Sequence, residues 1–310
     1  MALVFFGTPE FAVPSLRALV GEGFAVAAVV TQPDRAKGRS RSSVVPPPVK
    51  LAAVEEGLTV HQPANPNAPE FLEQLRDVGA ELGVVVAYGH LLKPQLLEIP
   101  PRGLINVHAS LLPKLRGAAP IEHAIVQGFE QTGVSIMQLD AGMDTGPVLH
   151  RVSTPVARDE TAGELTERLA ELGALALVEA LALVTTGAAQ PEPQDDGAAT
   201  YAPKITRELA RIPWDRPTEV IARHVRAFDP RPGAWTTLND AEIKLFGPRS
   251  ADEWEPGTEP GRVVETDPAL VVETVDGALQ FLDVQPAGRH RMAAGEWLRG
   301  RGAVKGDRFV

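Results

Sequence analysis

Residues 102–120, RGLINVHASLLPKLRGAAP, place an amide and an imidazole directly after an apolar run. The run Gly103-Leu104-Ile105 is typical of a buried strand, and Asn106 and His108 follow it. Because side chains two apart on a strand point to the same face, both residues can act on one substrate atom. Taken alone, the pair is better explained as a half-buried histidine and a turn-forming asparagine.

A second polar segment favours a functional role for Asn106 and His108. Residues 137–149, MQLDAGMDTGPVL, carry Asp140 and Asp144 in a glycine-rich loop after a strand-like run. An amide, an imidazole and a carboxylate together can stabilise a developing oxyanion and orient the imidazole. Since ligands of open parallel sheets bind beyond the carboxyl ends of the strands, we expect Asn106, His108 and Asp144 to converge at that edge.

Other chemistries fit these residues less well. A calcium loop would need ligands where the sequence has Gly142 and Arg151 at its third and twelfth positions. The histidines and aspartates lack the spacing of a zinc site, so we expect no metal. Ser110 lacks the flanking glycines of a nucleophile elbow. A direct transfer between two bound substrates is the remaining interpretation.

A basic segment near the N-terminus, TQPDRAKGRSRSSVVPPPVK, has two interpretations. Its cations are Arg35, Lys37, Arg39 and Arg41. They belong either to a solvated loop or to an arm that contacts phosphates. The preceding FFGTPEF is a strand-turn-helix pattern, but its single glycine does not make a dinucleotide fingerprint.

Composition limits the class of protein. With 310 residues, 44% of them hydrophobic, the chain is long enough for two domains, and its lack of cysteine excludes disulfides and thiolate chemistry. The net charge of −10 divides into −9 for residues 1–199 (14 Lys+Arg, 23 Asp+Glu) and −1 for residues 200–310 (16 and 17). Any RNA contact must therefore use local basic patches. We expect neither a signal peptide nor a membrane span, and hence a cytoplasmic protein.

The first 185 residues alternate apolar strands with helices, which predicts an α/β domain with a mainly parallel sheet covered on both faces. Its longest helical pattern begins near Thr161 and Glu164, which have capping-box spacing. Residues 190–204 are rich in proline and acidic residues without periodicity and indicate a linker. The predicted N-terminal domain is therefore residues 1–189.

Residues 205–310 differ in pattern. One short helix precedes several brief strands, and Asp276-Gly277 is a hairpin turn signal between two of them. Short strands with frequent turns favour a small barrel or sandwich. This part is the predicted C-terminal domain.

Several motifs together resemble the folate-dependent formyltransferase family. They are FGTPEFA, TQPDR, VVVAYG, INVHASLLPKLRGAAP, TGVSIMQLDAGMDTG, RAFDPRPGAW and LQPAG, in order along essentially the whole chain. SLLPxxRG and DxGxDTG mark the wider family, while RGAAPI and the basic loop point to its members that act on initiator tRNA. Ala109 departs from the pattern, where glycine is expected, and its methyl group restricts the backbone beside His108.

The resemblance implies a Rossmann-like formyltransferase domain followed by a C-terminal OB-like β-barrel that binds tRNA. It implies transfer of formyl from 10-formyltetrahydrofolate to the amino group of methionyl-initiator-tRNA, giving N-formylmethionyl-tRNA for translation initiation. We expect a metal-independent monomer with no membrane contact.

Three groups of site residues follow, the catalytic set and the folate loop from the resemblance and the tRNA contacts mainly from the local basic patches. The catalytic set is Asn106, His108 and Asp144. The folate-binding set is Ser110, Leu111, Leu112 and Pro113, with Tyr88 and Asp140 on two loops that we expect to line the pteridine slot. The tRNA-binding set is Arg35, Lys37, Arg39, Arg41, Arg289 and Arg291.

The same residues suggest why a buried strand would end in polar groups. Formyl transfer develops negative charge on oxygen, and donors on a rigid strand are already aimed at it. Asp144 would orient His108, favour its protonated form and assist proton loss from the attacking amine.

Two alternatives stay open. A related formyltransferase acting on a sugar amine or on glycinamide ribonucleotide would share the Asn-His-Asp set but lack the tRNA-binding barrel and the basic loop. A non-catalytic RNA-binding protein would leave the three residues scattered in space.

Overall fold

The computed structural model describes residues 1–37, 43–251, 254, 257 and 259–310. The chain forms two compact units. Unit 1 comprises residues 1–120, 131–155 and 166–202, and unit 2 comprises residues 121–130, 156–165 and 203–310.

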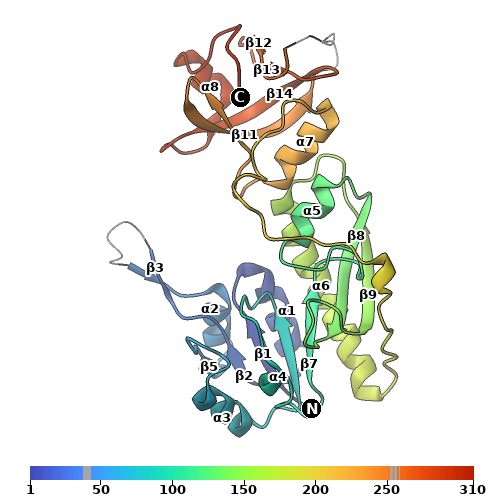
Figure 1. Cartoon of the computed structure of the whole chain (residues 1–310). Helices are drawn as coiled ribbons and strands as arrows, with labels where there is room; N and C mark the ends of the chain where they lie inside the picture. Colours follow the sequence, from blue (N-terminus) through green and yellow to red (C-terminus); the bar gives the residue numbers. More distant parts are fainter. Residues whose placement is uncertain (38–42, 252–253, 255–256, 258) are drawn as a thin grey trace. The chain divides into compact units, whose positions relative to one another are not determined.

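Unit 1 is built on a seven-stranded sheet of order β5-β2-β1-β6-β7-β8-β9 (Figure 1). Neighbouring strands from β5 to β7 run parallel, whereas β8 runs antiparallel to β7 and to β9. The strands are β1 (Ala2–Gly7), β2 (Ala25–Val30), β5 (Val60–His61), β6 (Leu82–Val86), β7 (Leu104–His108), β8 (Gln131–Gln138) and β9 (Val148–Pro155). The predicted Rossmann-like, mainly parallel sheet is confirmed.

Both faces of this sheet are covered. Val4 and Phe5 point to opposite faces of β1, and both are fully buried. A proline opens each of four helices at its first or second position, where the missing N–H has no intrahelical partner. They are α1 (Val13–Gly21, after the 3-10 turn Glu10–Ala12), α2 (Pro48–Glu55), α3 (Pro69–Val78) and α4 (Pro94–Leu97).

The long helix α6 (Ala162–Thr186) begins at the predicted capping box. The Thr161 N–H donates to Glu164 Oε2 at 2.9 Å, and the Glu164 N–H donates to Thr161 Oγ1 at 3.3 Å. A Cβ at Gly173 would lie 3.0 Å from Val107 Cγ1, so α6 packs closely on β7. By length and composition α6 could cross a membrane, a test that the core helix of a soluble protein also passes.

The predicted basic loop has a regular base. β3 (Arg35–Lys37) pairs antiparallel with β4 (Ser43–Val45), which ends in two β-branched valines. Arg39 and Arg41 lie outside the described residues.

The segment predicted as a linker is hydrogen-bonded to unit 1. Glu192 and Val148 exchange two backbone hydrogen bonds of 2.8 Å. Further along, the Arg116 N–H donates to Thr200 O at 2.9 Å, and the Ala202 N–H donates to Arg116 O at 2.8 Å. A short 3-10 turn, Asp196–Ala198, lies between these contacts. Residues 192–202 therefore form a strap along unit 1.

Unit 2 contains an antiparallel sheet of order β10-β11-β14-β13-β12, with β15 paired to β14. Its core includes Trp214, which stacks on Phe309 and meets Phe281 edge-on. This curled sheet is the predicted OB-like barrel. Its elements are α7 (Thr218–Ala227), β10 (Trp235–Leu238), β11 (Ala241–Ser250), β12 (Val263–Glu265), β13 (Leu270–Glu273), β14 (Ala278–Pro286), β15 (Met292–Ala293) and α8 (Ala294–Arg299), and most of α5 (Pro120–Val126) also belongs to unit 2.

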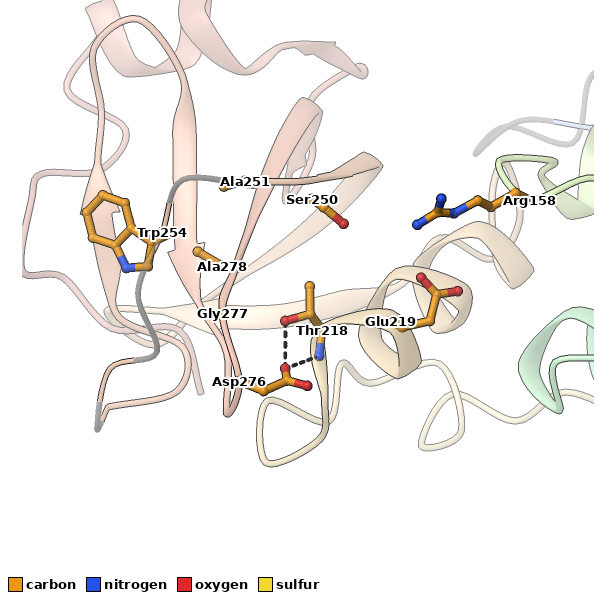
Figure 2. Close-up of a pocket in the computed structure, with 9 residues that line it drawn as sticks. All are labelled: Arg158, Thr218, Glu219, Ser250, Ala251, Trp254, Asp276, Gly277 and Ala278. Atoms are coloured by element: carbon orange, nitrogen blue, oxygen red, sulfur yellow. Dashed lines mark hydrogen bonds between the residues drawn. The ribbon is translucent and has the colours of Figure 1, made fainter.

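The predicted turn at Asp276-Gly277 joins β13 to β14 and also caps a helix. Asp276 Oδ1 accepts hydrogen bonds of 2.7 Å from both the N–H and the hydroxyl of Thr218, the first residue of α7 (Figure 2). These bonds lower the pKa of the Asp276 carboxyl. A cavity of about 420 Å³ borders this cap, with Glu219 and Trp254 among its lining residues (Figure 2).

Candidate active site

The strand β7 positions Asn106 and His108, two of the predicted catalytic residues. Its residues Leu104, Ile105, Val107 and His108 are buried, and Asn106 is half-buried. Asn106 and His108 lie on the same side of the strand and are in register with Met137 and Ser135 of β8. Close packing on both edges and against α6 makes β7 a rigid support for these side chains.

His108 is only 5% exposed and has a partner on each side of its ring. Nε2 lies 3.0 Å from Leu115 O, and because a carbonyl only accepts, Nε2 carries the hydrogen. Nδ1 lies 3.7 Å from Asp144 Oδ2. That separation is too long for a hydrogen bond but close enough for a carboxylate to stabilise a positive imidazole.

Asp144 reaches His108 from the loop after β8, a strand that runs antiparallel to β7. Because β8 is antiparallel to β7, its last residue, Gln138, is in register with Ile105 and not with His108. Asp144 therefore follows a strand end, as expected, but that end does not lie beside the carboxyl end of β7. Instead the β8–β9 loop brings it back, and Asp144 Oδ2 accepts a 2.8 Å hydrogen bond from the Gly117 N–H.

The predicted folate loop is only partly open to a ligand. Ser110 is 1% exposed, its hydroxyl donates to Lys114 O at 2.6 Å, and its carbonyl accepts from Ser135 Oγ at 2.7 Å. Leu112 is buried against Met137 and Val148. Leu111 and Pro113 are half-buried and present the accessible surface of this loop.

Tyr88 and Asp140 mainly shape their own loops. The Tyr88 ring is 2% exposed in the core of unit 1, while its carbonyl accepts hydrogen bonds from Thr8 Oγ1 and Gln32 Nε2, each 2.9 Å long. Burial raises the pKa of the Tyr88 hydroxyl to about 12. Asp140 accepts from the Gly142 N–H at 2.9 Å and from Thr145 Oγ1 at 2.8 Å.

The predicted tRNA-binding residues have different surroundings. Arg291 is held by Asp229 at 2.7 Å and Asp283 at 2.9 Å, and its guanidinium lies over the Phe246 ring. Arg289 and Arg35 are exposed, and Arg35 donates to Gln32 Oε1. Lys37 is the last residue of β3.

Two residues beside this site were not among the predicted ones. Arg116 lies within the quoted RG motif, and its side chain is 2% exposed. Its guanidinium donates to Gln194 Oε1 from Nε at 3.0 Å and from Nη2 at 2.9 Å. Gln194 lies in the proline- and acid-rich strap, which carries no periodic pattern to mark it.

The arrangement suits charge stabilisation at one atom. β7 presents an amide and an imidazole on one face, and a carboxylate lies 3.7 Å from the imidazole. Such a set can hold a negative oxygen and accept a proton from an incoming nucleophile.

Comparison with known proteins matches both parts of the chain. Residues 1–181 match the formyl transferase family and residues 204–302 match the formyl transferase C-terminal domain. The methionyl-tRNA formyltransferase of Halorhodospira halophila is 46% identical over 306 residues, which cover 98% of each chain. That of Moorella thermoacetica is 44% identical over 308 residues, covering 99% of this chain and 98% of its own.

Solved structures share the fold at low identity. HypX from Aquifex aeolicus in complex with tetrahydrofolic acid has a TM-score of 0.66 at 20% identity, over 99% of this chain and 50% of its own. Methionyl-tRNA formyltransferase from Clostridium thermocellum has a TM-score of 0.57 at 16% identity, over 89% of this chain and 100% of its own. With both domain matches and full-length relatives at this identity, the chain belongs to the methionyl-tRNA formyltransferase family.

Proposed function

We propose that this chain transfers the formyl group of 10-formyltetrahydrofolate to the free amino group of methionyl-initiator-tRNA, giving N-formylmethionyl-tRNA for translation initiation. The observation that carries the proposal is the His108–Asp144 pair, 3.7 Å apart, beside Asn106 on β7. Full-length similarity to methionyl-tRNA formyltransferases supports the choice of acceptor. We assign formyl transfer to residues 1–189 and tRNA binding to residues 205–310, joined by residues 190–204.

In this mechanism 10-formyltetrahydrofolate supplies the activated formyl group, and the methionyl amine attacks it directly. Asn106 and His108 donate hydrogen bonds to the formyl oxygen as negative charge develops there. Because His108 Nε2–H is already bound to Leu115 O, the donor to the substrate is Nδ1–H of the protonated ring. Asp144 stabilises that ring and accepts a proton from the attacking amine. The new bond joins the amine nitrogen to the formyl carbon, the bond from that carbon to N10 of the folate breaks, and N10 takes up a proton as tetrahydrofolate leaves.

The two loops that we assign to the pteridine have suitable surfaces. Each carries a strongly exposed apolar side chain, Leu91 at 79% and Met143 at 57%. An aromatic ring bound there would remove this apolar surface from water. Positive φ angles at Ala87 (46°) and Gly89 (82°) turn the first loop sharply, which directs main-chain groups out of the strand direction. We infer that residues 87–92 and 139–144 line the slot, with Leu111 and Pro113 at its margin.

For tRNA we propose two basic regions. The first is the arm that begins with the β3–β4 hairpin, with Arg35, Lys37, Arg39 and Arg41. The second is the turn after β14, where exposed Arg289 contacts phosphate and Arg291 supports the turn through its two carboxylate partners. We further propose that the protein is a cytoplasmic monomer without membrane contact.

The test is a comparison of amine acceptors. Purified protein and 10-formyltetrahydrofolate are incubated separately with methionyl-initiator-tRNA, methionyl-elongator-tRNA, an amino-sugar nucleotide and glycinamide ribonucleotide, and formylated product is measured over time. We expect the highest kcat/KM with methionyl-initiator-tRNA. Faster formylation of either small amine would replace the proposal by that activity, and binding of tRNA without any formylation would favour a non-catalytic RNA-binding protein.

A further inference from the structure

We propose that Gln194, in the strap between the two family-matched parts of the chain, is a positioning residue that holds Asp144 opposite His108. The inference rests on the proposed function, because it gives Asp144 a role in proton transfer. Gln194 lies outside both matched ranges, residues 1–181 and 204–302. It is also outside every motif that marks the family in this sequence.

The side chain of Gln194 uses both ends of its amide. Its Nε2 donates to Asp144 O at 2.8 Å and to Gly146 O at 2.7 Å. Its Oε1 accepts from Arg116 Nε at 3.0 Å and from Arg116 Nη2 at 2.9 Å. Two donors and two acceptor contacts satisfy the whole hydrogen-bonding capacity of the group, so its orientation is determined.

The first pair of bonds acts on the backbone of Asp144. Asp144 has φ of 55°, in the left-handed region that non-glycine residues adopt only when their surroundings hold them there. Gln194 holds its carbonyl, and the Gly117 N–H holds its carboxylate at 2.8 Å. Main chain and side chain are thus fixed by different segments, which sets the direction of the carboxylate.

The second pair acts on the loop that bounds His108 from the other side. Arg116 follows Leu115, whose carbonyl accepts from His108 Nε2 and whose φ is 59°. The buried guanidinium is neutralised by Asp196 at 2.8 Å, a second residue of the strap. Gln194 therefore connects the loop that holds His108 to the loop that carries Asp144.

The Gln194 amide makes both the bonds to Arg116 and the bonds to the carbonyls of Asp144 and Gly146. Different substitutions at Gln194 can therefore remove one set of bonds or both. Glutamate keeps an acceptor for Arg116 but cannot donate to the carbonyls of Asp144 and Gly146. Methionine has a similar length and makes neither connection. Gln190→Glu, at an exposed glutamine of the chain preceding the strap, controls for the added negative charge.

Steady-state formylation is measured for full-length wild type, Q194E, Q194M, Q190E, D144N and the double variant Q194E/D144N. For Q194E and Q194M we expect kcat to fall about 10-fold to 100-fold with KM for both substrates within about twofold, since a misdirected carboxylate affects reaction more than binding. Q190E should match wild type. In the D144N background Q194E should change kcat by less than about threefold, because its target is already removed.

A readout that does not depend on activity is amide hydrogen exchange at Gly117, whose N–H donates to the Asp144 carboxylate. We expect exchange at least about tenfold faster in Q194E than in wild type if the carboxylate is released. The positioning role would be overturned if Q194E lowered kcat by the same factor with and without D144N. It would also be overturned if both Gln194 variants kept wild-type kcat and wild-type exchange. If one Gln194 variant fails to fold, the other decides the outcome. Failure of wild type to formylate methionyl-initiator-tRNA would instead refute the proposed function.

Discussion

The loops around His108 in unit 1 and the barrel core of unit 2 are held by different kinds of contact. Around His108, buried polar groups bond to main chain across the loops, and the non-glycine residues Leu115 and Asp144 have positive φ. In unit 2, Trp214 packs between Phe281 and Phe309 with ring centroids 6.0 and 5.9 Å away. Directional bonds fix where a few atoms point, whereas apolar packing supplies stability with less demand on direction.

This comparison predicts that substitutions at the site change rate more than stability, and that core substitutions do the reverse. The four tryptophans, at positions 214, 235, 254 and 297, all belong to unit 2, so their fluorescence reports the unfolding of that unit.

The largest effect should come from the predicted catalytic pair. Asp144→Asn keeps an oxygen for the Gly117 N–H, and His108→Gln keeps a donor for Leu115 O. Each should lower kcat about 10²-fold to 10⁴-fold through loss of charge stabilisation or proton transfer. Rates are measured under saturating substrates, with Asp77→Asn on the exposed surface of α3 as control. Near-normal turnover in either variant would remove that residue from the mechanism.

The opposite case is Phe281→Ala in the barrel core, where the side chain is 1% exposed. Loss of a buried ring should lower the free energy of unfolding of unit 2 by about 3–5 kcal/mol, measured by urea titration with tryptophan fluorescence. Leu282, the next residue, is 42% exposed, and Leu282→Ala should cost less than about 1 kcal/mol. Equal costs at the two positions would contradict the packing described for this core.

A buried histidine in unit 2 should make the stability of that unit depend on pH. His224 is 7% exposed, and burial lowers its pKa from the ordinary 6.5 to about 4. Between these two pKa values the unfolded state binds a proton on His224 and the folded state does not. The free energy of unfolding is therefore unaffected by this group above pH 6.5 and decreases as the pH falls from 6.5 toward 4. A pKa lowered from 6.5 to about 4 corresponds to about 3 kcal/mol of unfolding free energy.

We expect His224→Gln to reduce the slope of unfolding free energy against pH between about 4 and 6.5. His290→Gln, at an exposed histidine of the same unit, should leave the slope unchanged. Superimposable pH profiles for wild type and His224→Gln would show that this histidine is not the titrating group.

The smallest effect belongs to the exposed cap of α7. Asp276→Ala removes both hydrogen bonds to Thr218 and should cost about 1 kcal/mol in the same urea titration. Asp276→Asn keeps an oxygen acceptor and should cost less. If the two variants lose equal stability, the carboxylate charge and not the hydrogen bonds supports the helix.

Features that depend on neighbouring residues could be predicted from the sequence. The capping box at Thr161 and Glu164, the hairpin at Asp276-Gly277, and the common face of Asn106 and His108 all follow from periods and spacings of a few residues. The mainly parallel sheet follows from continuous apolar strands between helices, because such strands are buried on both faces.

Long-range pairing was decided only by the tertiary structure. A strand pattern does not state its direction, so the sequence could suggest that Asp144 lies near His108 but not that it returns there from an antiparallel β8. Gln194 reaches Asp144 across 50 residues and Arg116 across 78 residues, within a segment whose composition indicates only a linker. Hydrogen bonds of this kind depend on where folding places two distant backbones, and no local periodicity records that placement.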